Sequence, residues 1–262
     1  MRDGPLTPDT KVIDLWTLAE HRVPGLTARL GGAELLGREE RERFARLRRQ
    51  ASRRRFLGGR LLARIALGSR AELPLDAWRF TTGRHGRPEP SPDHGGLRFN
   101  LSHTPGLIVC VVTRGRACGV DVERVPFDAD KARFVTAYLD TTGRPTPYRA
   151  PDTTGRPTPY RAPDADGDPS ERWVLTEAYL KGLGVGLSGG PGGLEFRGLA
   201  PGRFAVTDRR RPATGARWQL QLLRPSPHHL LAVATEGGGT IHRHEPAWSE
   251  PVSNSRPTTP TS

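Results

Sequence analysis

Lysine is nearly absent from this basic sequence. Of 40 lysines and arginines only Lys11, Lys131 and Lys181 are lysines, and the formal net charge is +12. Such a charge creates a positive field that favours phosphorylated ligands or an acidic protein partner, by steering rather than by specificity. Nucleic acid is the usual interpretation of so basic a chain, but the sequence has no zinc finger, aromatic stacking motif or recognisable reading helix. We therefore expect no nucleic-acid partner.

Cysteine and long apolar runs are scarce as well. Cys110 and Cys118 are too few for a disulfide framework or a closed zinc site, so both are predicted to be reduced core thiols. No apolar run approaches the ~20 residues of a membrane span. The polar first residues lack the core of a signal peptide. We therefore expect a cytoplasmic monomer with no membrane partner.

The apolar pattern predicts an α+β protein in two parts. We expect strands at residues 11–16, 78–81, 97–101, 107–113, 118–123, 194–196, 203–206, 218–223 and 230–234, one long basic helix at 38–67, and a helix at 128–139. Residues 101–115 and 223–237 share five of fifteen positions, which is a weak sign of internal duplication. The expected division is an N-terminal half at 1–115 and a C-terminal half at 116–237.

Two segments are predicted to be irregular. Residues 140–151 are repeated without change as residues 152–163, and their proline and glycine content excludes a helix interior or a central strand. We expect a surface loop at 140–163, because lengthening an exposed loop costs little closure entropy. The last residues, 238–262, contain many Pro, Ser and Thr and few core formers, which predicts a disordered tail.

Carboxylates alternate with valines in residues 119–123 (GVDVE). On a β-strand Asp121 and Glu123 would leave the same face, while the two valines would enter the core. Alternating acids are more often only a half-solvated strand edge. Two carboxylates on one face could also meet one cation, and Mg²⁺ prefers oxygen ligands.

Residues 173–181 (WVLTEAYLK) have helical spacing. Glu177 and Lys181 then lie one turn apart on one face, which brings a third carboxylate beside an ammonium group. Taken alone, such a pair is usually a surface ion pair of little energetic weight. Trp173, one turn earlier, is predicted to pack rather than to stack on a ligand.

Four motifs occur in a characteristic order: residues 83–88 (GRHGRP), 99–104 (FNLSHT), 119–123 and 173–181. This order resembles the Sfp-type 4′-phosphopantetheinyl transferases over residues 38 to 187. The resemblance implies a pseudo-two-fold pair of similar halves with the active site in the cleft between them. It also implies transfer of the 4′-phosphopantetheine arm of coenzyme A to a serine of an apo acyl or peptidyl carrier protein, with release of 3′,5′-ADP.

The resemblance assigns roles to the acidic motifs. Asp121, Glu123 and Glu177 match the family's acidic trio and are expected to hold Mg²⁺. Glu177 is the candidate general base for the incoming serine, directly or through water. Lys181 matches the family lysine that contacts the phosphates of coenzyme A and stabilises charge on the leaving group.

Four further residues are candidates for binding the phosphates of coenzyme A: Arg54, Arg87, Ser102 and His103. Continuing the apolar stripe of the basic helix leads to Arg54, which matches the family arginine on the 3′-phosphate; Arg53 and Arg55 are near alternatives. Ser102 and His103 would lie at the cleft end of their strand, and the family's histidine touches the phosphates.

The sequence departs from the family at two places. Arg87 stands where the family usually has lysine, so charge is kept with a different geometry. Thr176 replaces a lysine of many relatives, which removes one expected phosphate contact.

Two other functions are open to the same residues. Ser102 and His103 could suggest a hydrolase, but the sequence has no nucleophile elbow. A non-catalytic module that binds coenzyme A or another phospho-ligand would need no general base, so the retained Glu177 argues against it.

Overall fold

The computed structural model describes residues 11–83, 87–140, 168–186, 190 and 192–247. In chain order the elements are β1 (Val12–Ala19), α1 (Val23–Leu30), α2 (Arg38–Arg46), α3 (Gln50–Gly68), β2 (Phe80–Thr82), β3 (Pro88–Pro90), β4 (Leu97–Thr104), β5 (Leu107–Arg114), β6 (Cys118–Arg124), α4 (Ala129–Asp140), α5 (Pro169–Leu183), β7 (Leu194–Ala200), β8 (Arg203–Asp208), α6 (Pro212–Gly215), β9 (Trp218–Ser226), β10 (His229–Glu236) and β11 (Thr240–His244). The predicted α+β class is confirmed.

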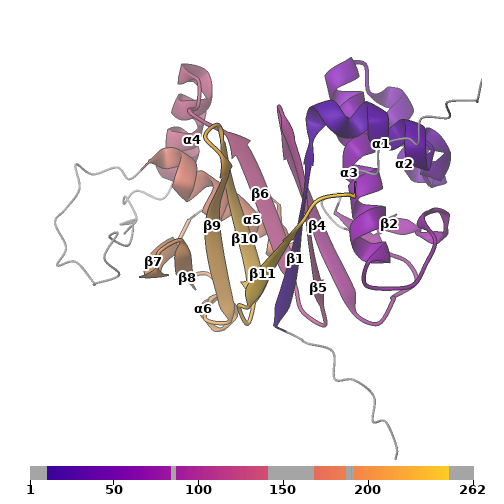
Figure 1. The fold of residues 1–262 in the computed structure, drawn as a ribbon. Helices are drawn as coiled ribbons and strands as arrows, with labels where there is room; N and C mark the ends of the chain where they lie inside the picture. The colour runs from indigo at the N-terminus through magenta and orange to yellow at the C-terminus, as the bar shows by residue number, and fades with distance from the viewer. Residues whose placement is uncertain (1–10, 84–86, 141–167, 187–189, 191, 248–262) are drawn as a thin grey trace, which may run out of the picture.

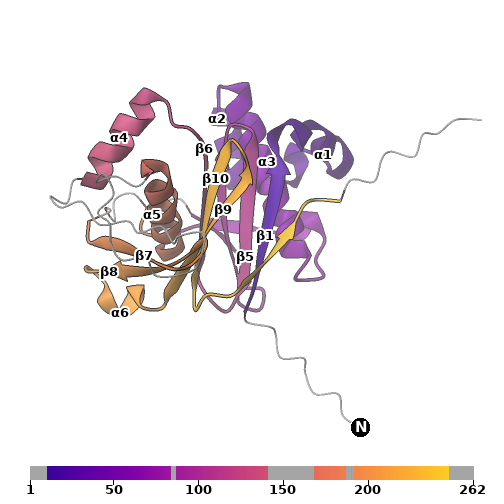
Figure 2. The same ribbon diagram turned by 60° about the vertical axis from the view of Figure 1, so that its left-hand side comes forward.

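The strands form two main sheets. Their orders are β11-β1-β5-β4 and β6-β10-β9-β8-β7, and β2 and β3 form a separate small ribbon. Figure 1 shows the two sheets side by side, with α1, α2 and α3 beyond the first sheet. Figure 2 brings α5 to the front, against the second sheet. No helix in the described part of the chain is both long and apolar enough to cross a membrane.

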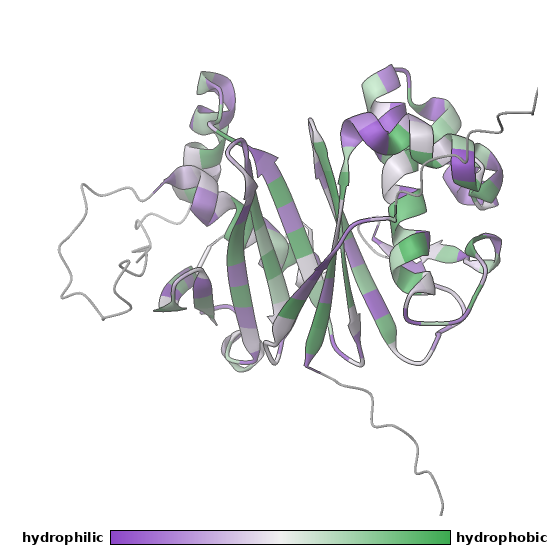
Figure 3. Cartoon of the chain, viewed as in Figure 1, coloured by the Kyte–Doolittle hydropathy of each residue, from purple (hydrophilic) through white to green (hydrophobic). Residues whose placement is uncertain are grey.

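Apolar residues of the strands form three cores. One lies between α3 and the first sheet, a second between α5 and the second sheet, and a third between the sheets, where Val120 and Val122 are buried. Figure 3 shows hydrophobic and hydrophilic residues alternating along the strands, as expected where the two faces of a strand meet different surroundings. The inward direction predicted for the two valines is confirmed.

The edge strands β4 and β6 meet through side chains rather than a backbone ladder. Asn100, Ser102 and Thr104 follow each other at a spacing of two along β4. Their side-chain oxygens accept hydrogen bonds from backbone N–H groups of β6 at 3.0, 3.3 and 3.2 Å. Because buried backbone donors need partners, these three side chains join the two sheets along the line where the predicted site lies.

The basic segment 38–67 forms two helices instead of the one that was predicted. Leu47 and Arg49 are extended, so α2 ends before α3 begins. The Arg53 guanidinium donates to the carbonyls of Phe44 and Leu47 at 3.1 and 3.4 Å. An arginine can cap the last carbonyls of a helix in this way. Arg53 therefore stabilises the end of α2, and its guanidinium is engaged in this contact.

The prediction of a disordered tail from residue 238 is wrong for residues 238–247. β11 pairs in parallel with β1 from Val12 to Trp16 and so extends the first sheet (Figure 1). His244 anchors this strand to β1. Its Nε2 lies 2.8 Å from Oδ1 of the buried Asp14, and its ring stacks on that of Trp16 with the ring centres 4.8 Å apart. Residues 248–262, and all of the repeat 140–163 except Asp140, lie outside the described residues.

Candidate active site

The site is built where α5 crosses β6. A Cβ atom on Gly119 would lie 2.1 Å from the carbonyl oxygen of Ala178 and 2.3 Å from the nitrogen of Gly182, so only glycine permits this close approach. The helix begins at Pro169 and is capped by Asp168, whose carboxylate accepts a hydrogen bond from the Ser170 N–H at 2.9 Å. The close approach at Gly119 places α5 directly against the strand that carries the carboxylates.

Lys181, Asp121 and Ser102 form one hydrogen-bonded group. The Lys181 ammonium lies 2.5 Å from Asp121 Oδ1 and donates to Ser102 Oγ at 3.1 Å, and the Ser102 hydroxyl donates to Asp121 Oδ1 at 2.9 Å. Burial alone would lower the pKa of Lys181, but the charge of Asp121 and its hydrogen bond raise it above its usual value. Lys181 is therefore a cation held by a buried carboxylate.

Glu123 lies on the same face of β6 and is held by two donors. Its Oε2 is 2.6 Å from the ammonium of Lys131 on α4, and its Oε1 accepts from the indole N–H of Trp173 at 3.0 Å. Trp173 is buried and packs edge-on against Phe134 and Tyr138. The prediction that Trp173 packs is confirmed, and its indole also fixes Glu123.

Glu177 lies between these two contacts along α5, one turn from Trp173 and one turn from Lys181. It is only 8% exposed, and its Oε1 has no hydrogen-bond partner among the described residues. Burial, followed by the nearby charge of Asp121, raises the pKa of Glu177 to about 7. A carboxyl with this pKa can take up a proton near neutral pH.

The carboxylates of Asp121, Glu123 and Glu177 are the predicted ligands of a cation. No three His, Cys, Asp or Glu side chains converge as metal ligands within the residues that the structure describes. Asp121 Oδ2 and Glu177 Oε1 are both buried without a partner, and the two charges oppose each other. Hard carboxylate oxygens of this kind fit Mg²⁺, so the magnesium site remains a prediction with two suitable oxygens.

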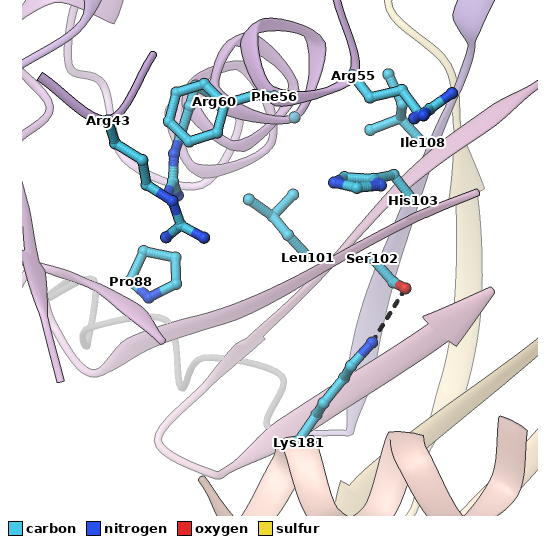
Figure 4. Close-up of a pocket in the computed structure, with 11 residues that line it drawn as sticks. Arg43, Arg55, Phe56, Arg60, Pro88, Leu101, Ser102, His103, Ile108 and Lys181 are labelled. Carbon is cyan, nitrogen blue, oxygen red and sulfur yellow. Dashed lines mark hydrogen bonds between the residues drawn. The ribbon is translucent and has the colours of Figure 1, made fainter. Parts of the chain in front are cut away.

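A cationic pocket of about 260 Å³ opens beside this group. Its lining residues are Arg43, Arg55, Phe56, Gly59, Arg60, Pro88, Leu101, Ser102, His103, Ile108 and Lys181. Figure 4 shows Arg43, Arg60 and Phe56 at one end, Arg55 and His103 at the other, and Lys181 reaching Ser102 from below. Desolvation, with the nearby charges of Arg55 and Lys181, lowers the pKa of His103. The structure thus brings Ser102, His103 and Lys181 into one pocket.

Arg54 is placed differently from Arg55. Both pair with the buried Glu20: Arg54 Nη2 lies 2.8 Å from Oε1 and Arg55 Nη1 lies 3.3 Å from Oε2. Glu20 also accepts from the Gly106 N–H at 2.9 Å, and together these contacts lower its pKa although burial opposes the shift. Only Arg55 lines the pocket. The assignment of Arg54 to the 3′-phosphate stays a prediction.

Arg87 joins the two halves. Its guanidinium donates to the carbonyls of Lys181 and Gly182, each at 3.0 Å, and to those of Phe99 and Cys118 at 3.3 and 3.4 Å. Several donors in a planar fork suit this task better than a single ammonium. A phosphate contact by Arg87 stays a prediction. Thr176, the second departure from the family, is buried.

Four residues near the site were not predicted: Arg43, Phe56, Arg60 and Lys131. Arg60 pairs with Glu40 at 3.2 Å, yet its buried Nη1 has no partner in the described part of the chain. The four-residue spacing of Phe56 and Arg60 could have indicated that both side chains lie on one face of the helix. Nothing in the sequence connects Lys131 with Glu123, because the contact joins two elements.

Comparison with known proteins gives the family. The chain is 30% identical over 207 residues to a phosphopantetheinyl transferase of Thraustochytrium sp., covering 77% of this chain and 70% of that protein. It is 27% identical over 209 residues to the 4′-phosphopantetheinyl transferase HetI of Nostoc sp., covering 79% and 81%. No protein-family model matches the sequence. The chain belongs to the phosphopantetheinyl transferase family, as its motifs predicted.

Proposed function

We propose that this protein transfers the 4′-phosphopantetheine group of coenzyme A to a serine of an apo acyl or peptidyl carrier protein, as a cytoplasmic, Mg²⁺-dependent enzyme of the Sfp type. The observation that carries the proposal is the position of Glu177. Its buried carboxylate, whose Oε1 has no hydrogen-bond partner among the described residues and whose pKa is about 7, lies beside Asp121 and Lys181 next to a pocket lined by arginines. A binding module would have no need of such a group.

The pocket supports a donor with several phosphates. Arg43, Arg55, Arg60, His103 and Lys181 bring positive or chargeable groups to a single cavity. Charge-assisted hydrogen bonds to phosphate are strong where water is partly excluded. Because Arg60 keeps one buried N–H group without a partner among the described residues, a phosphate oxygen would complete its hydrogen bonding.

In the proposed reaction Glu177 takes the proton of the carrier serine as the serine oxygen attacks phosphorus. The new O–P bond forms while the pyrophosphate P–O bond to 3′,5′-ADP breaks. Lys181, oriented by Asp121 and Ser102, faces the charge that builds up on the leaving phosphate. Fixed cations of this kind stabilise charge that develops in the transition state.

Mg²⁺ would be held by Asp121 and Glu177, each of which keeps a buried oxygen without a partner in the part of the chain that the structure describes, with Glu123 as the third member of the predicted trio. When bound, the ion would neutralise pyrophosphate charge.

The strand orders support two similar halves. In each sheet a strand pairs with the second strand of a hairpin that follows it in the chain. β1 pairs with β5 of the β4–β5 hairpin, and β6 pairs with β10 of the β9–β10 hairpin. The two segments that share residues, 101–115 and 223–237, fall on the hairpins β4–β5 and β9–β10. We infer a pseudo-two-fold relation, with the pocket at the line where the halves meet.

One experiment tests the proposal. The protein is incubated with coenzyme A, Mg²⁺ and a panel of apo carrier proteins, and mass spectrometry is used to look for the phosphopantetheine adduct. An adduct on the carrier serine is the expected result. Binding of coenzyme A in calorimetry without an adduct on any carrier would favour the binding module instead.

A further inference from the structure

The turn between β4 and β5 joins two residues of the pocket wall. His103 near the end of β4 and Ile108 near the start of β5 face each other in the register of the hairpin. Both line the pocket at the end where Arg55 lies (Figure 4). A contact that fixes this turn therefore also fixes one end of the pocket.

Glu20 connects the turn with Arg55. The Gly106 N–H donates to Glu20 Oε2 at 2.9 Å, and the Gly106 carbonyl accepts from the Glu20 N–H, also at 2.9 Å. The same carboxylate contacts Arg55, whose Nη1 lies 3.4 Å from Oε1 and 3.3 Å from Oε2. Because Glu20 is buried between these partners, a shift of the turn would move the carboxylate that holds Arg55.

A histidine of the C-terminal half holds the turn from its other side. His229, the first residue of β10, lies with Nε2 3.0 Å from the Pro105 carbonyl oxygen and with Nδ1 2.8 Å from Ser226 Oγ. A carbonyl oxygen only accepts hydrogen bonds, so Nε2 is the donor, and the Ser226 hydroxyl can donate to Nδ1. One proton on the ring thus satisfies both partners.

His229 and Glu20 bind opposite ends of one peptide group. The Pro105 carbonyl and the Gly106 N–H belong to the same planar unit, which accepts from the histidine and donates to the carboxylate. The ring also lies directly on Gly106, where a Cβ atom would be 3.2 Å from both Cε1 and Nε2 of the ring. Gly106 has a φ of +95°, so only glycine suits both the conformation and the close approach.

We propose that His229 is a positioning residue for the coenzyme A pocket. It orients the peptide group between Pro105 and Gly106, whose N–H aligns Glu20. Glu20 in turn holds Arg55 on the pocket wall. This inference rests on the proposed function for the binding of coenzyme A, and adds to it a residue of the C-terminal half that lies outside the pocket lining. The N-terminal half supplies the arginine, and the C-terminal half supplies its alignment.

Calorimetry with coenzyme A tests the role of His229 without any need for transfer. The full-length protein is used at pH 8, above the usual titration range of histidine. His229→Leu removes the donor and should raise the Kd for coenzyme A about fivefold, an effect typical of a residue that acts through a contact network. His229→Gln, whose amide can donate to the same carbonyl, should stay within about twofold of the wild type.

His228→Leu is the matched control. It makes the same substitution at the preceding position, where the side chain is exposed and the backbone carbonyl accepts from the Val125 N–H. Its Kd should equal that of the wild type. Circular dichroism checks that each variant is folded.

Combination with Arg55→Ala shows whether His229 acts through that arginine. In the Arg55→Ala background His229→Leu should change the Kd about 1.5-fold or less, because the guanidinium that it aligns is gone. A residue that only stabilises the fold would weaken binding by the same factor in both backgrounds. With saturating coenzyme A, kcat of His229→Leu should stay within about twofold, since Glu177 and Lys181 are untouched.

The outcomes distinguish this inference from the proposed function. A wild-type Kd in folded His229→Leu would overturn the inference, and so would an equal loss of affinity with and without Arg55. Binding of coenzyme A without an adduct on any carrier would contradict the proposed transfer, while the Kd values would still decide the role of His229. A wild-type protein that binds no coenzyme A would overturn both.

Discussion

The arginine-rich face of α3 and the carboxylate strand β6 concentrate charge of opposite sign, and each is balanced from another element. On α3 two glutamates each serve two arginines: Glu20 holds Arg54 and Arg55, and Glu40 from α2 holds Arg60 and Arg64. These pairs set two carboxylates against four guanidinium groups, so they offset only part of the basic excess that the sequence shows. Among the described residues they leave one buried N–H group of Arg60 and one of Arg64 without a hydrogen-bond partner.

On β6 the balance comes from lysines of α4 and α5, and it is incomplete. Three carboxylates face two ammonium groups, and Glu177 is the one that no lysine holds. The difference between α3 and β6 indicates which charged groups are available to bind a ligand. In both regions paired atoms stabilise the fold, and the buried atoms without a partner in the described part of the chain include Arg60 Nη1, whose residue lines the cationic pocket, and one oxygen each of Asp121 and Glu177.

Glu177→Gln should therefore give the largest effect, on activity. Removal of a general base typically costs about 10²–10⁴-fold in rate, and we expect kcat for transfer to fall in that range. Coenzyme A should still bind, since the pocket arginines are untouched. The adduct is measured by mass spectrometry and binding by calorimetry. A cleanly folded variant with full activity would remove Glu177 from the mechanism.

Glu40→Ala should give the largest effect on stability. Arg64 is fully buried and lies 2.6 Å from Glu40, and Arg60 lies 3.2 Å away. Removing the shared carboxylate leaves two buried cations uncompensated, which typically costs about 3–5 kcal/mol. The free energy of unfolding is measured by urea denaturation.

Glu42→Ala is the control for that change. Glu42 pairs with Arg38 on the exposed face of α2 at 3.1 Å, and such a surface pair contributes about 0–1 kcal/mol. Equal losses in the two variants would show that burial of the charge does not matter, and the contrast between paired and exposed charge would fail.

Replacing the buried Glu177 carboxyl is expected to stabilise the folded protein above neutral pH. Its pKa is about 7 in the folded protein against 4.5 ordinarily, so between these values the folded state holds the proton more tightly than the unfolded state. The free energy of unfolding then falls as pH rises from about 4.5 to about 7, by up to about 3 kcal/mol. Glu177→Gln should lose this fall and be more stable than the wild type at pH 8.

The measurement is made in EDTA, because a bound cation would favour the charged carboxylate. Denaturation midpoints of the wild type and Glu177→Gln are compared at pH 5 and pH 8. Parallel curves over this range would show that Glu177 is not destabilised by burial and by Asp121, and would contradict the assigned pKa.

Local patterns in the sequence predicted the geometry of the two elements that carry the candidate site, β6 and α5. Alternation in residues 119–123 gave the directions of Asp121 and the valines, and helical spacing brought Glu177 and Lys181 to one face of α5. Both patterns depend only on the period of a single element. The α+β class followed from the same periodicities.

Contacts between distant elements could not be predicted in this way. The break at Leu47 depends on Arg53 capping the carbonyls of α2, and the order of β11 depends on Asp14 and Trp16, more than 200 residues earlier. The Lys131 contact to Glu123 likewise joins a helix and a strand. Such pairs are set by tertiary geometry, which a period along one element does not contain.

The smallest predicted effect separates Arg54 from Arg55. The sequence assigns Arg54 to the 3′-phosphate of coenzyme A, whereas the structure lines the pocket with Arg55, whose side chain is 18% exposed against 39% for Arg54. Glu20 holds both, so either single variant leaves the other guanidinium paired. We expect Arg55→Ala to raise the KM for coenzyme A about tenfold, about 1.4 kcal/mol, and Arg54→Ala to raise it about threefold or less.

Dephospho-coenzyme A, which lacks the 3′-phosphate, shows what each arginine reads. If Arg55 binds that group, Arg55→Ala should raise the KM for coenzyme A more than the KM for the dephospho form. Equal rises with both donors would assign Arg55 to the pyrophosphate instead. A rise confined to Arg54→Ala and to coenzyme A would restore the assignment made from the sequence, and would mean that Arg54 leaves Glu20 when the donor binds.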